Sequence, residues 1–497
     1  MPSLKISRRA VIAGGSTQPQ NFRLLNLLGV VVLSHFSASS IAADLTGDWP
    51  QWRGPNASGA AVAAKPPTTW SESENIKWKT EVPGSGSSTP IVLGDHVYIA
   101  TAVKTERIEP ATKNSAGNSA GNTADSANDN QTQTQSDENS PTQRGQRSFG
   151  RGHSGSQPQS ARGNYYDFMV LAYNRATGQE VWRTTLTSQI PHEVGHSTNT
   201  YASSSPITDG EKLYVSFGSH GIYCLSLGGD KLWAKDLGKM QTRNQFGEGS
   251  SAAVHNGTLV VAFDHEGDSF IAALDANTGG ERWRQARDER TTWATPLITE
   301  FRGRAQVVTN GSNRVRSYDL ETGELIWQCG GQAGNPIPSP VRFEDNVIVM
   351  TGFRGYAIYS IPLSSVGDIT GTDAVTWFEQ DAAPYVSSPV LYEGQLYYVK
   401  GNNGVLVSRD AKTGQLLIDQ TRLPEISSVY ASPVAAGDHI YLTSREGTTI
   451  VFNHAKSFKV VATNKLNAEI DASAAIGGDE IFLRSKTHLY CIASTER

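Results

Sequence analysis

The chain has 497 residues, of which 48 are glycine and 22 are proline, and its formal net charge is −5 at pH 7. So many glycines suit an all-β protein with many tight turns, and the charge gives no reason to expect a nucleic-acid partner. The three cysteines, Cys224, Cys329 and Cys491, are odd in number and far apart, so we expect buried core residues and neither a disulfide framework nor a zinc ribbon.

Residues 1–43 have the layout of a cleaved export signal. Arginines that include Arg8 and Arg9 precede an apolar run from Leu24 to Leu33, and cleavage is expected after Ala42 or Ala43. Ordinary secretion is the expected route. A twin-arginine signal and an uncleaved anchor remain alternatives, although ten apolar residues are too few to span a bilayer. We therefore expect a periplasmic or secreted bacterial monomer without a lipid anchor or a transmembrane span in its mature form.

A short motif, a small hydroxyl residue followed by proline or alanine and then an aliphatic residue, predicts the fold class. It occurs eight times, at Thr89-Pro90, Ser205-Pro206, Ser251-Ala252, Thr295-Pro296, Ser339-Pro340, Ser388-Pro389, Ser432-Pro433 and Ser473-Ala474. Each copy leads into short β-branched and aromatic runs that read as four strands. Four strands at a spacing of about 40 to 50 residues is the period of a propeller blade. The sequence thus predicts an eight-bladed β-propeller over residues 44–497.

The last unit ends at Leu489–Ile492 without a fourth strand, whereas residues 75–79 form an orphan strand before the first unit. We expect this N-terminal strand to complete the last blade. Ring closure of that kind removes the exposed sheet edges.

Residues 102–164 are rich in Ser, Asn, Gln, Thr and Gly and are predicted to be a disordered polar insertion between the second and third strands of the first blade. Its arginines could contact polyanions, but a solvated loop is the better interpretation. The dinucleotide-like spelling Gly150–Gly155 lies inside it without a flanking strand and helix, so it is rejected as a motif.

A second repeated element is a turn with Asp or Asn, then Thr-Gly, then tryptophan four residues later. It occurs at Asn174–Trp182, Asp275–Trp283 and Asp319–Trp327, and a weaker copy at Asp410–Gly414 has Ile418 in place of tryptophan. The acidic or amide side chain can bond the amides of its own turn while glycine takes positive φ. The tryptophan then starts the outgoing strand.

His192-Glu193-Val194-Gly195-His196 spells a zinc-protease signature. That chemistry needs a helix, which places both histidines on one face. Pro191 and Gly195 argue against a helix, so we predict a loop between blades.

The Thr-Gly-Trp repeats, together with Trp49-Pro50-Gln51-Trp52-Arg53-Gly54-Pro55, resemble the PQQ-like β-propellers, the fold of quinoprotein alcohol dehydrogenases and of the outer-membrane assembly factor BamB. The resemblance covers roughly residues 48–495 without the insertion. It implies that tryptophans pack flat against the neighbouring blade, and these are Trp78, Trp182, Trp233, Trp283, Trp327 and Trp377. The chain lacks the adjacent cysteine pair and the calcium ligands of the family's dehydrogenases.

The resemblance also implies a ligand face, formed by the loops that enter the innermost strands and those that join second to third strands. The candidate binding residues there are His192, His196, Arg243, Asn244, Glu248, Arg290, Trp293, Asn335, Arg354, Tyr385, Asn402, Tyr430, Arg445, Asp471 and Arg484, with Asn199 and Tyr201. Asp264, His265 and Glu266 are the weak candidates for an acid or base, because carboxylates that flank an imidazole can hold a cation or relay a proton.

Three functions follow from this sequence. The first is a non-catalytic binding or scaffold module whose partner is a polar small molecule, a glycan or an envelope protein. The second is a quinoprotein-type oxidoreductase with an altered site for PQQ and calcium, and the third is a hydrolase or lyase at the channel mouth. A propeller fold by itself does not decide among them.

Overall fold

The computed structural model describes residues 47–109 and 163–494. The chain divides into two units, residues 1–43 and residues 44–497. The predicted export signal lies outside the described residues, and so does the larger part of the predicted insertion, with the Gly150–Gly155 spelling.

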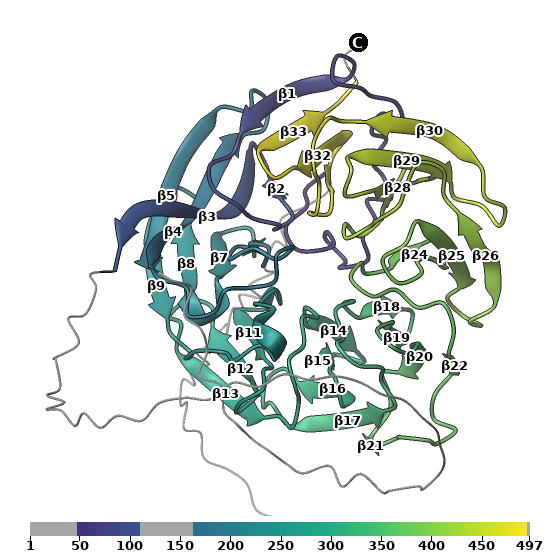
Figure 1. The fold of residues 1–497 in the computed structure, drawn as a ribbon. Coiled ribbons are helices and arrows are strands. Elements are labelled where there is room, and N and C mark those ends of the chain that lie inside the picture. Colours follow the sequence, from purple (N-terminus) through teal and green to yellow (C-terminus); the bar gives the residue numbers. More distant parts are fainter. Residues whose placement is uncertain (1–46, 110–162, 495–497) are drawn as a thin grey trace, which may run out of the picture. The chain divides into compact units, whose positions relative to one another are not determined.

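The second unit is a ring of eight four-stranded antiparallel blades, one of which carries an added fifth strand in parallel, and this confirms the predicted propeller (Figure 1). Blade 1 consists of β2 (Ile91–Leu93), β3 (His96–Ile108), β4 (Asn164–Asn174) and β5 (Glu180–Gln189), and blade 2 of β6 (Ile207–Thr208), β7 (Lys212–Ser216), β8 (Ile222–Ser226) and β9 (Lys231–Lys235). Blade 3 consists of β10 (Ala253–His255), β11 (Thr258–Phe263), β12 (Phe270–Asp275) and β13 (Glu281–Ala286), and blade 4 of β14 (Leu297–Phe301), β15 (Arg304–Asn310), β16 (Arg314–Asp319) and β17 (Leu325–Gly330).

Blade 5 consists of β18 (Val341–Phe343), β19 (Asn346–Thr351), β20 (Ala357–Pro362) and β22 (Trp377–Glu379), and blade 6 of β23 (Val390–Tyr392), β24 (Gln395–Val399), β25 (Val405–Asp410) and β26 (Leu416–Arg422). Blade 7 consists of β27 (Val434–Ala436), β28 (His439–Thr443), β29 (Thr448–Asn453) and β30 (Val460–Lys465), and blade 8 of β31 (Ala475–Gly477), β32 (Glu480–Arg484), β33 (His488–Ile492) and β1 (Ile76–Glu81). The remaining elements are β21 (Gly367–Asp368) and two short 3-10 helices, η1 (Gly218–His220) and η2 (Arg243–Gln245).

Strand β1 pairs antiparallel with β33 and completes blade 8, as predicted. The ring is therefore closed by the two ends of the propeller sequence, and β33 has a partner on both sides.

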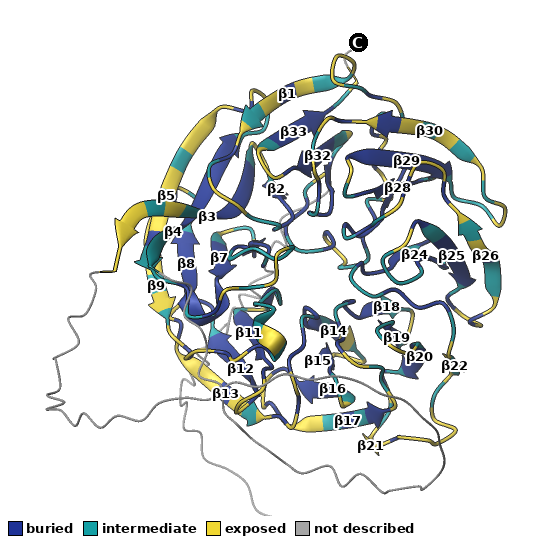
Figure 2. Ribbon diagram, viewed as in Figure 1, coloured by how far each residue is buried: buried dark blue, intermediate teal, exposed yellow. Residues whose placement is uncertain are grey.

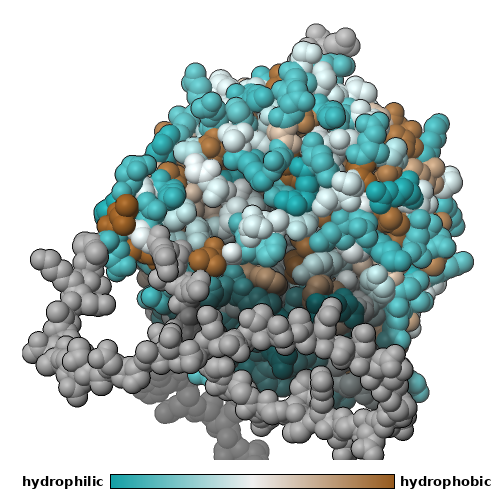
Figure 3. Space-filling view, in the orientation of Figure 1, coloured by the Kyte–Doolittle hydropathy of each residue, from teal (hydrophilic) through white to brown (hydrophobic). Residues whose placement is uncertain are grey.

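The core lies between blades as much as within them. The inner and middle strands are buried while the outermost strands are partly exposed (Figure 2). One apolar cluster, for example, joins Val170 of blade 1 to Leu213 of blade 2. All three cysteines are buried and free of disulfides, in agreement with their predicted role. The surface in the view of Figure 3 is mainly hydrophilic, with scattered apolar side chains.

The insertion differs from its prediction at both ends. Strand β3 continues to Ile108 and β4 begins at Asn164, so the predicted boundaries, 102 and 164, both fall within strands. Val103 pairs with Asp167, and the guanidinium of Arg107 lies 3.4 Å from the ring centre of Tyr165. These cross-strand contacts extend the hairpin into residues whose polar composition looked unsuited to a sheet.

The Thr-Gly turns and their tryptophans have the predicted geometry in most blades. Oδ1 of Asn174 accepts the N–H groups of Ala176 and Thr177, each at 3.0 Å. A Cβ on Gly178, whose φ is +71°, would lie 2.6 Å from the Trp78 ring of blade 8. The same contact between a tryptophan and a turn glycine of the next blade recurs in four other pairs: Trp182 with Gly229, Trp233 with Gly279, Trp283 with Gly323, and Trp377 with Gly414.

Trp327 packs differently from the other predicted docking tryptophans. It is fully buried and pairs through its backbone with Gly367 of β21, in the connection between β20 and β22. Its neighbours are Leu363 and Ile369, and its indole N–H has no hydrogen-bond partner among the described residues. The connection in blade 5 is longer than the other turns, and its Thr370-Gly371 contacts no tryptophan, because nothing lies within 4 Å of a Cβ on Gly371.

Candidate functional site

The repeated hydroxyl motif forms a belt of hydrogen bonds around the propeller axis. We call it the hydroxyl belt and define it by Thr89, Ser205, Ser251, Thr295, Ser339, Ser388, Ser432 and Ser473. Seven links run from the backbone N–H of one member to the side-chain oxygen of the next, at 2.8–3.2 Å. The belt thus explains why blades 2 to 8 begin with serine or threonine.

The belt is interrupted between blades 8 and 1. The hydroxyl of Thr89 is buried without a partner among the described residues. At this junction Nη1 of Arg484 donates to Oγ of Ser88 at 2.7 Å and to the carbonyl of Ala100. Burial lowers the pKa of Arg484 to about 10. Arg484, a predicted ligand residue, therefore lies in the wall between two blades.

Residues 49–61, which we call the axial segment, cross the ring beside the belt. The indole N–H of Trp52 donates to Oγ of Ser339 at 3.1 Å. Nη2 of Arg53 donates to the carbonyls of Pro389 and Pro433, at 2.9 and 2.8 Å. The segment ties blades 5, 6 and 7 together and places Trp52 at one end of a cavity. A second cavity of about 470 Å³ follows the segment and contains none of the predicted site residues.

The axial cavity has a volume of about 380 Å³. Connections into the innermost strands of all eight blades contribute to its wall. Six aromatic residues line it, namely Trp52, Phe246, Trp293, Phe353, Tyr385 and Tyr430, together with His196, Thr198, Asn199, Glu248, Asp471 and part of the hydroxyl belt. The rings of Phe353 and Tyr385 stack at 4.8 Å, and Trp293 is anchored by a 2.7 Å bond to the carbonyl of Gly247.

A side cavity of about 300 Å³ lies beside the axial cavity, among the connections from blades 1 and 2. Both cavities are lined by His196, Asn199, Ser203 and Glu248. The side cavity adds His192, Glu193, Tyr201 and His220. The predicted loop residues therefore meet here, although the sequence places them on separate segments.

Glu248 stands on the wall that the two cavities share. Its Oε2 accepts the N–H of Ser219 at 2.8 Å. A Cβ on Gly218 would lie 1.5 Å from the same oxygen, so only glycine leaves room for this carboxyl group. No lysine, arginine or histidine among the described residues forms an ion pair with it, and burial raises the pKa of Glu248 to about 7.

The histidine tautomers in the side cavity follow from their carbonyl partners. Nε2 of His192 lies 2.8 Å from the carbonyl of Met240, and Nδ1 of His220 lies 3.3 Å from that of Phe217. A carbonyl only accepts, so these nitrogens carry the hydrogen and the other ring nitrogens are acceptors. Burial lowers the pKa of His220 to about 4, which keeps this ring neutral, and its Nε2 has no partner among the described residues.

The zinc-protease spelling is a loop, as predicted. Glu193 accepts the N–H and the hydroxyl of Thr242, which ties the loop to the next connection. In the described part of the chain no three His, Cys, Asp or Glu side chains are arranged to hold a metal ion.

Two predicted arginines contact other predicted residues, and one of them, Arg445, contacts the lining of the axial cavity. Nη1 of Arg243 donates to the buried Asn335 at 3.1 Å. Nε of Arg445 lies 2.5 Å from Oδ1 of Asp471, and its guanidinium lies 4.2 Å from the ring centre of Tyr430. These contacts hold two lining residues in place.

The remaining candidates lie outside the lining. Arg354 lies against the ring of Phe353, at 5.2 Å, and Oδ1 of Asn402 accepts the N–H of Val386. Asn244 and Arg290 are exposed.

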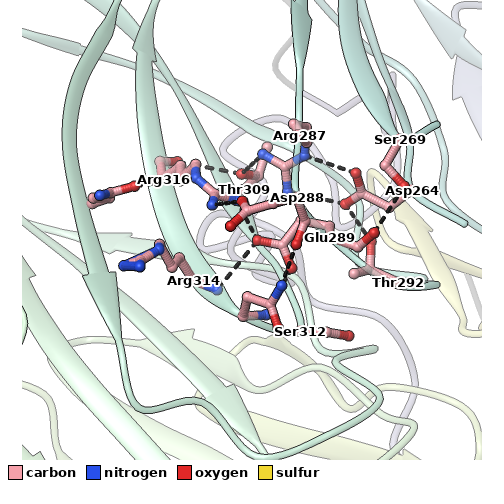
Figure 4. Close-up of polar contacts among 12 residues, drawn as sticks. Asp264, Ser269, Arg287, Asp288, Glu289, Thr292, Thr309, Ser312, Arg314 and Arg316 are labelled. Atoms are coloured by element: carbon pink, nitrogen blue, oxygen red, sulfur yellow. Dashed lines mark hydrogen bonds and ion pairs between the residues drawn. The ribbon is translucent and has the colours of Figure 1, made fainter. Parts of the chain in front are cut away.

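The three weak acid–base candidates are engaged in structural contacts, and Figure 4 shows those of Asp264. Asp264 is buried and forms a two-pronged ion pair with Arg287, at 2.7 and 2.9 Å. Nδ1 of His265 accepts the N–H groups of Gln241 and Gly267, and burial lowers the pKa of His265. Glu266 accepts the N–H and hydroxyl of Thr291. None of the three lines either cavity.

Sequence reasoning missed Trp52, Thr198, Phe246 and Phe353 as lining residues. Trp52 is part of the N-terminal signature, but nothing in the signature says that it crosses the axis. Phe246 and Phe353 are isolated apolar residues in polar loops, and that contrast is the signal that could have found them.

Comparisons with known proteins agree with this architecture. A family model described as outer membrane protein assembly factor BamB matches residues 67–227 and 218–460. The quinohemoprotein alcohol dehydrogenase from Comamonas testosteroni superposes with a TM-score of 0.55 at 10% identity, over 92% of this chain and 82% of that one. No protein of curated function matches the sequence.

Two further solved structures are similar over a smaller part of the chain. BamB from Moraxella catarrhalis has a TM-score of 0.47 at 13% identity, over 65% of this chain and 93% of its own. The computationally designed protein Ika8 has a TM-score of 0.47 at 12% identity, over 66% and 92% of the two chains.

Proposed function

Because the chain belongs to the BamB-like family of PQQ-like β-propellers, we propose that it is an extracytoplasmic binding or scaffold propeller that takes its ligand in the axial cavity without transforming it. The axial cavity carries this proposal. It is concave, lined in part by six aromatic rings, and supplied with convergent polar groups, which is the usual make-up of a small-molecule site. The acid–base candidates at 264–266, by contrast, are engaged elsewhere.

The rings also favour a particular kind of contact. Aromatic faces bind sugars, other rings and hydrocarbon groups through area and stacking. A polar small molecule or the terminal sugar of a glycan suits a cavity of about 380 Å³. An envelope protein would bind at this cavity by inserting one of its side chains, and the propeller would then act as a scaffold.

The residues do not fit PQQ with calcium. PQQ carries several carboxylates, which need nearby cations. Among the described residues, the lining of the axial cavity contains no lysine or arginine and includes Glu248 and Asp471. Arg445 is already paired with Asp471, and the three cysteines are separate and buried. The oxidoreductase alternative therefore has less support than the binding module.

An extracytoplasmic location rests on the export signal predicted for residues 1–43. Within residues 47–109 and 163–494, the structure contains no helix that could span a membrane.

Ligand-observed NMR with 2-phenylethanol, a neutral probe with one ring, tests whether the axial cavity binds. We expect saturable binding to the purified protein that is lost in Trp293→Ala and largely kept in Trp293→Phe, because the second variant retains a ring. Binding that survives Trp293→Ala, or no binding to the parent protein, would contradict a ligand site at the axis. Thermal unfolding of both variants separates loss of the site from loss of the fold.

A further inference from the structure

The charges around the two cavities define the ligand class. We propose that the axial and side cavities together bind an organic ammonium ion, with its hydrocarbon body among the rings of the axial cavity and its ammonium group at Glu248. This inference rests on the proposed function, because it concerns the same site.

The first argument is charge. The described residues that line the two cavities include Glu193, Glu248 and Asp471 and neither lysine nor arginine. Only Asp471 has a cationic partner, Arg445. A carboxylate held away from water is unfavourable without a counter-charge. A ligand that carries a positive charge supplies what Glu248 lacks.

The second argument is hydrogen bonding. Two donors in the side cavity are already used: the hydroxyl of Tyr201 donates to the carbonyls of Glu193 and Val194, and the amide of Asn199 to those of Phe246 and Glu248. The buried acceptors with spare capacity on this wall are the Glu248 carboxylate and Nε2 of His220. A primary ammonium group has three donors and no acceptor, so it complements this set.

The third argument is the aromatic wall. Rings attract cations through their electron-rich faces, and this attraction is strongest where water is excluded. Six rings line the axial cavity, and the His196 and Phe246 rings, 5.1 Å apart, lie where it meets the side cavity. The same rings accept a hydrocarbon body. An anion of equal size would meet carboxylates and acceptors instead.

A bare metal ion fits these residues less well. The carboxylate of Glu193 is committed to Thr242, and no three-ligand group is present among the described residues. Among the described residues that line the two cavities, the other carboxylates, Glu193 and Asp471, already accept hydrogen bonds, so Glu248 has no second free carboxylate beside it.

The proposed contact at the Glu248 carboxyl requires glycine at position 218. Its φ of +56° and the 1.5 Å approach of Oε2 to the position of a Cβ show that the backbone of η1 is shaped around the Glu248 carboxyl. The variant Gly218→Ala puts a Cβ where that carboxyl lies and replaces no residue that lines either cavity, so it complements Glu248→Gln as a probe.

The test compares 2-phenylethylammonium with its neutral analogue 2-phenylethanol by titration calorimetry and ligand-observed NMR at pH 8. We expect the ammonium ion to bind at least about 10-fold more tightly, since a charge-assisted hydrogen bond contributes more than one decade in affinity. Glu248→Gln and Gly218→Ala are each expected to abolish that preference, so that either variant binds the ammonium ion no more tightly than 2-phenylethanol. Glu211→Gln, at a side chain that is 83% exposed, is the matched control.

Each outcome has one meaning. If 2-phenylethanol binds at Trp293 but the ammonium ion binds no more tightly, or its preference survives Glu248→Gln, the ammonium inference is wrong and the binding function stands. Saturable binding of calcium or zinc that depends on Glu248 also overturns it. If neither phenyl probe binds, both the inference and the proposed axial site fail.

Discussion

At the scale of single residues, the hydroxyl belt shows how one side-chain oxygen can link neighbouring blades around the axis. Thr89 and Thr295 occupy equivalent positions and are both buried. The hydroxyl of Thr295 accepts the N–H of Ser251 at 3.1 Å, whereas that of Thr89 has no partner among the described residues. The two threonines therefore form a matched pair.

We predict that Thr295→Val lowers the free energy of unfolding by about 1–3 kcal/mol, because it leaves a buried N–H without an acceptor. Thr89→Val is expected to be neutral or slightly stabilising, because it replaces an unpaired hydroxyl by a methyl group of the same shape. Urea unfolding of both variants measures the difference. Equal losses would show that the belt bonds contribute nothing.

Glu248 predicts a pH dependence of stability. Its folded-state pKa, about 7, is above the ordinary value of 4.5, so the folded protein binds the proton more tightly than the unfolded chain does. The free energy of unfolding therefore falls as pH rises. The loss is absent below about pH 4.5, grows as pH rises toward 7 and is constant above, to a total of about 3 kcal/mol. Urea unfolding at pH 5 and pH 8 should show this loss in the parent protein but not in Glu248→Gln. An equal loss of stability in the parent protein and in Glu248→Gln would show that groups other than Glu248 cause it.

The candidate site was only partly predictable at this scale. His196, Glu248, Trp293, Tyr385, Tyr430 and Asp471 were proposed and do line the axial cavity. Asp264 looked available because its partner, Arg287, is 23 residues away along the chain. Loop conformations, which local sequence does not determine, decide which polar side chains face a cavity and which face each other.

At the scale of elements, the turn and its tryptophan form one unit that joins neighbouring blades. The indole N–H of Trp283 donates to the carbonyl of Leu320 at 2.9 Å, while its ring covers Gly323. Because the turn chemistry is local, it could be predicted from spacing alone. The packing of Trp327 could not, since its cover comes from an irregular connection in the next blade.

Trp283→Ala is expected to reduce the free energy of unfolding by about 3–5 kcal/mol, as for other large-to-small changes in a core. Leu232→Ala is the control, because this side chain of an equivalent outer strand is 50% exposed and should change stability by less than about 0.5 kcal/mol. Binding of 2-phenylethanol to the folded fraction of Trp283→Ala should be unchanged. A loss of stability in Trp283→Ala as small as that in Leu232→Ala would show that the packing of the tryptophan against the turn does not join the blades.

At the scale of the whole propeller, closure by β1 and support by the axial segment both come from the residues before position 82. The orphan strand made the closure predictable, because a blade without a fourth strand needs one from elsewhere. The course of the axial segment across the ring was not predictable, since residues 49–61 form no regular strand.

A chain that begins after Glu81 is expected to associate, because it exposes the edge of β33 and opens the axis. Light scattering of this truncated chain, beside a chain that begins at Asp44, measures the effect. A folded monomer without residues 44–81 would contradict the role given to the closing strand.

The most direct test of the central claim, that the axis is a binding site without a quinone cofactor, is titration calorimetry of the purified protein with PQQ in the presence and absence of calcium. The charges of the cavity predict no saturable heat under either condition. Saturable, calcium-dependent binding that is lost in Asp471→Asn would contradict the claim and favour the oxidoreductase alternative.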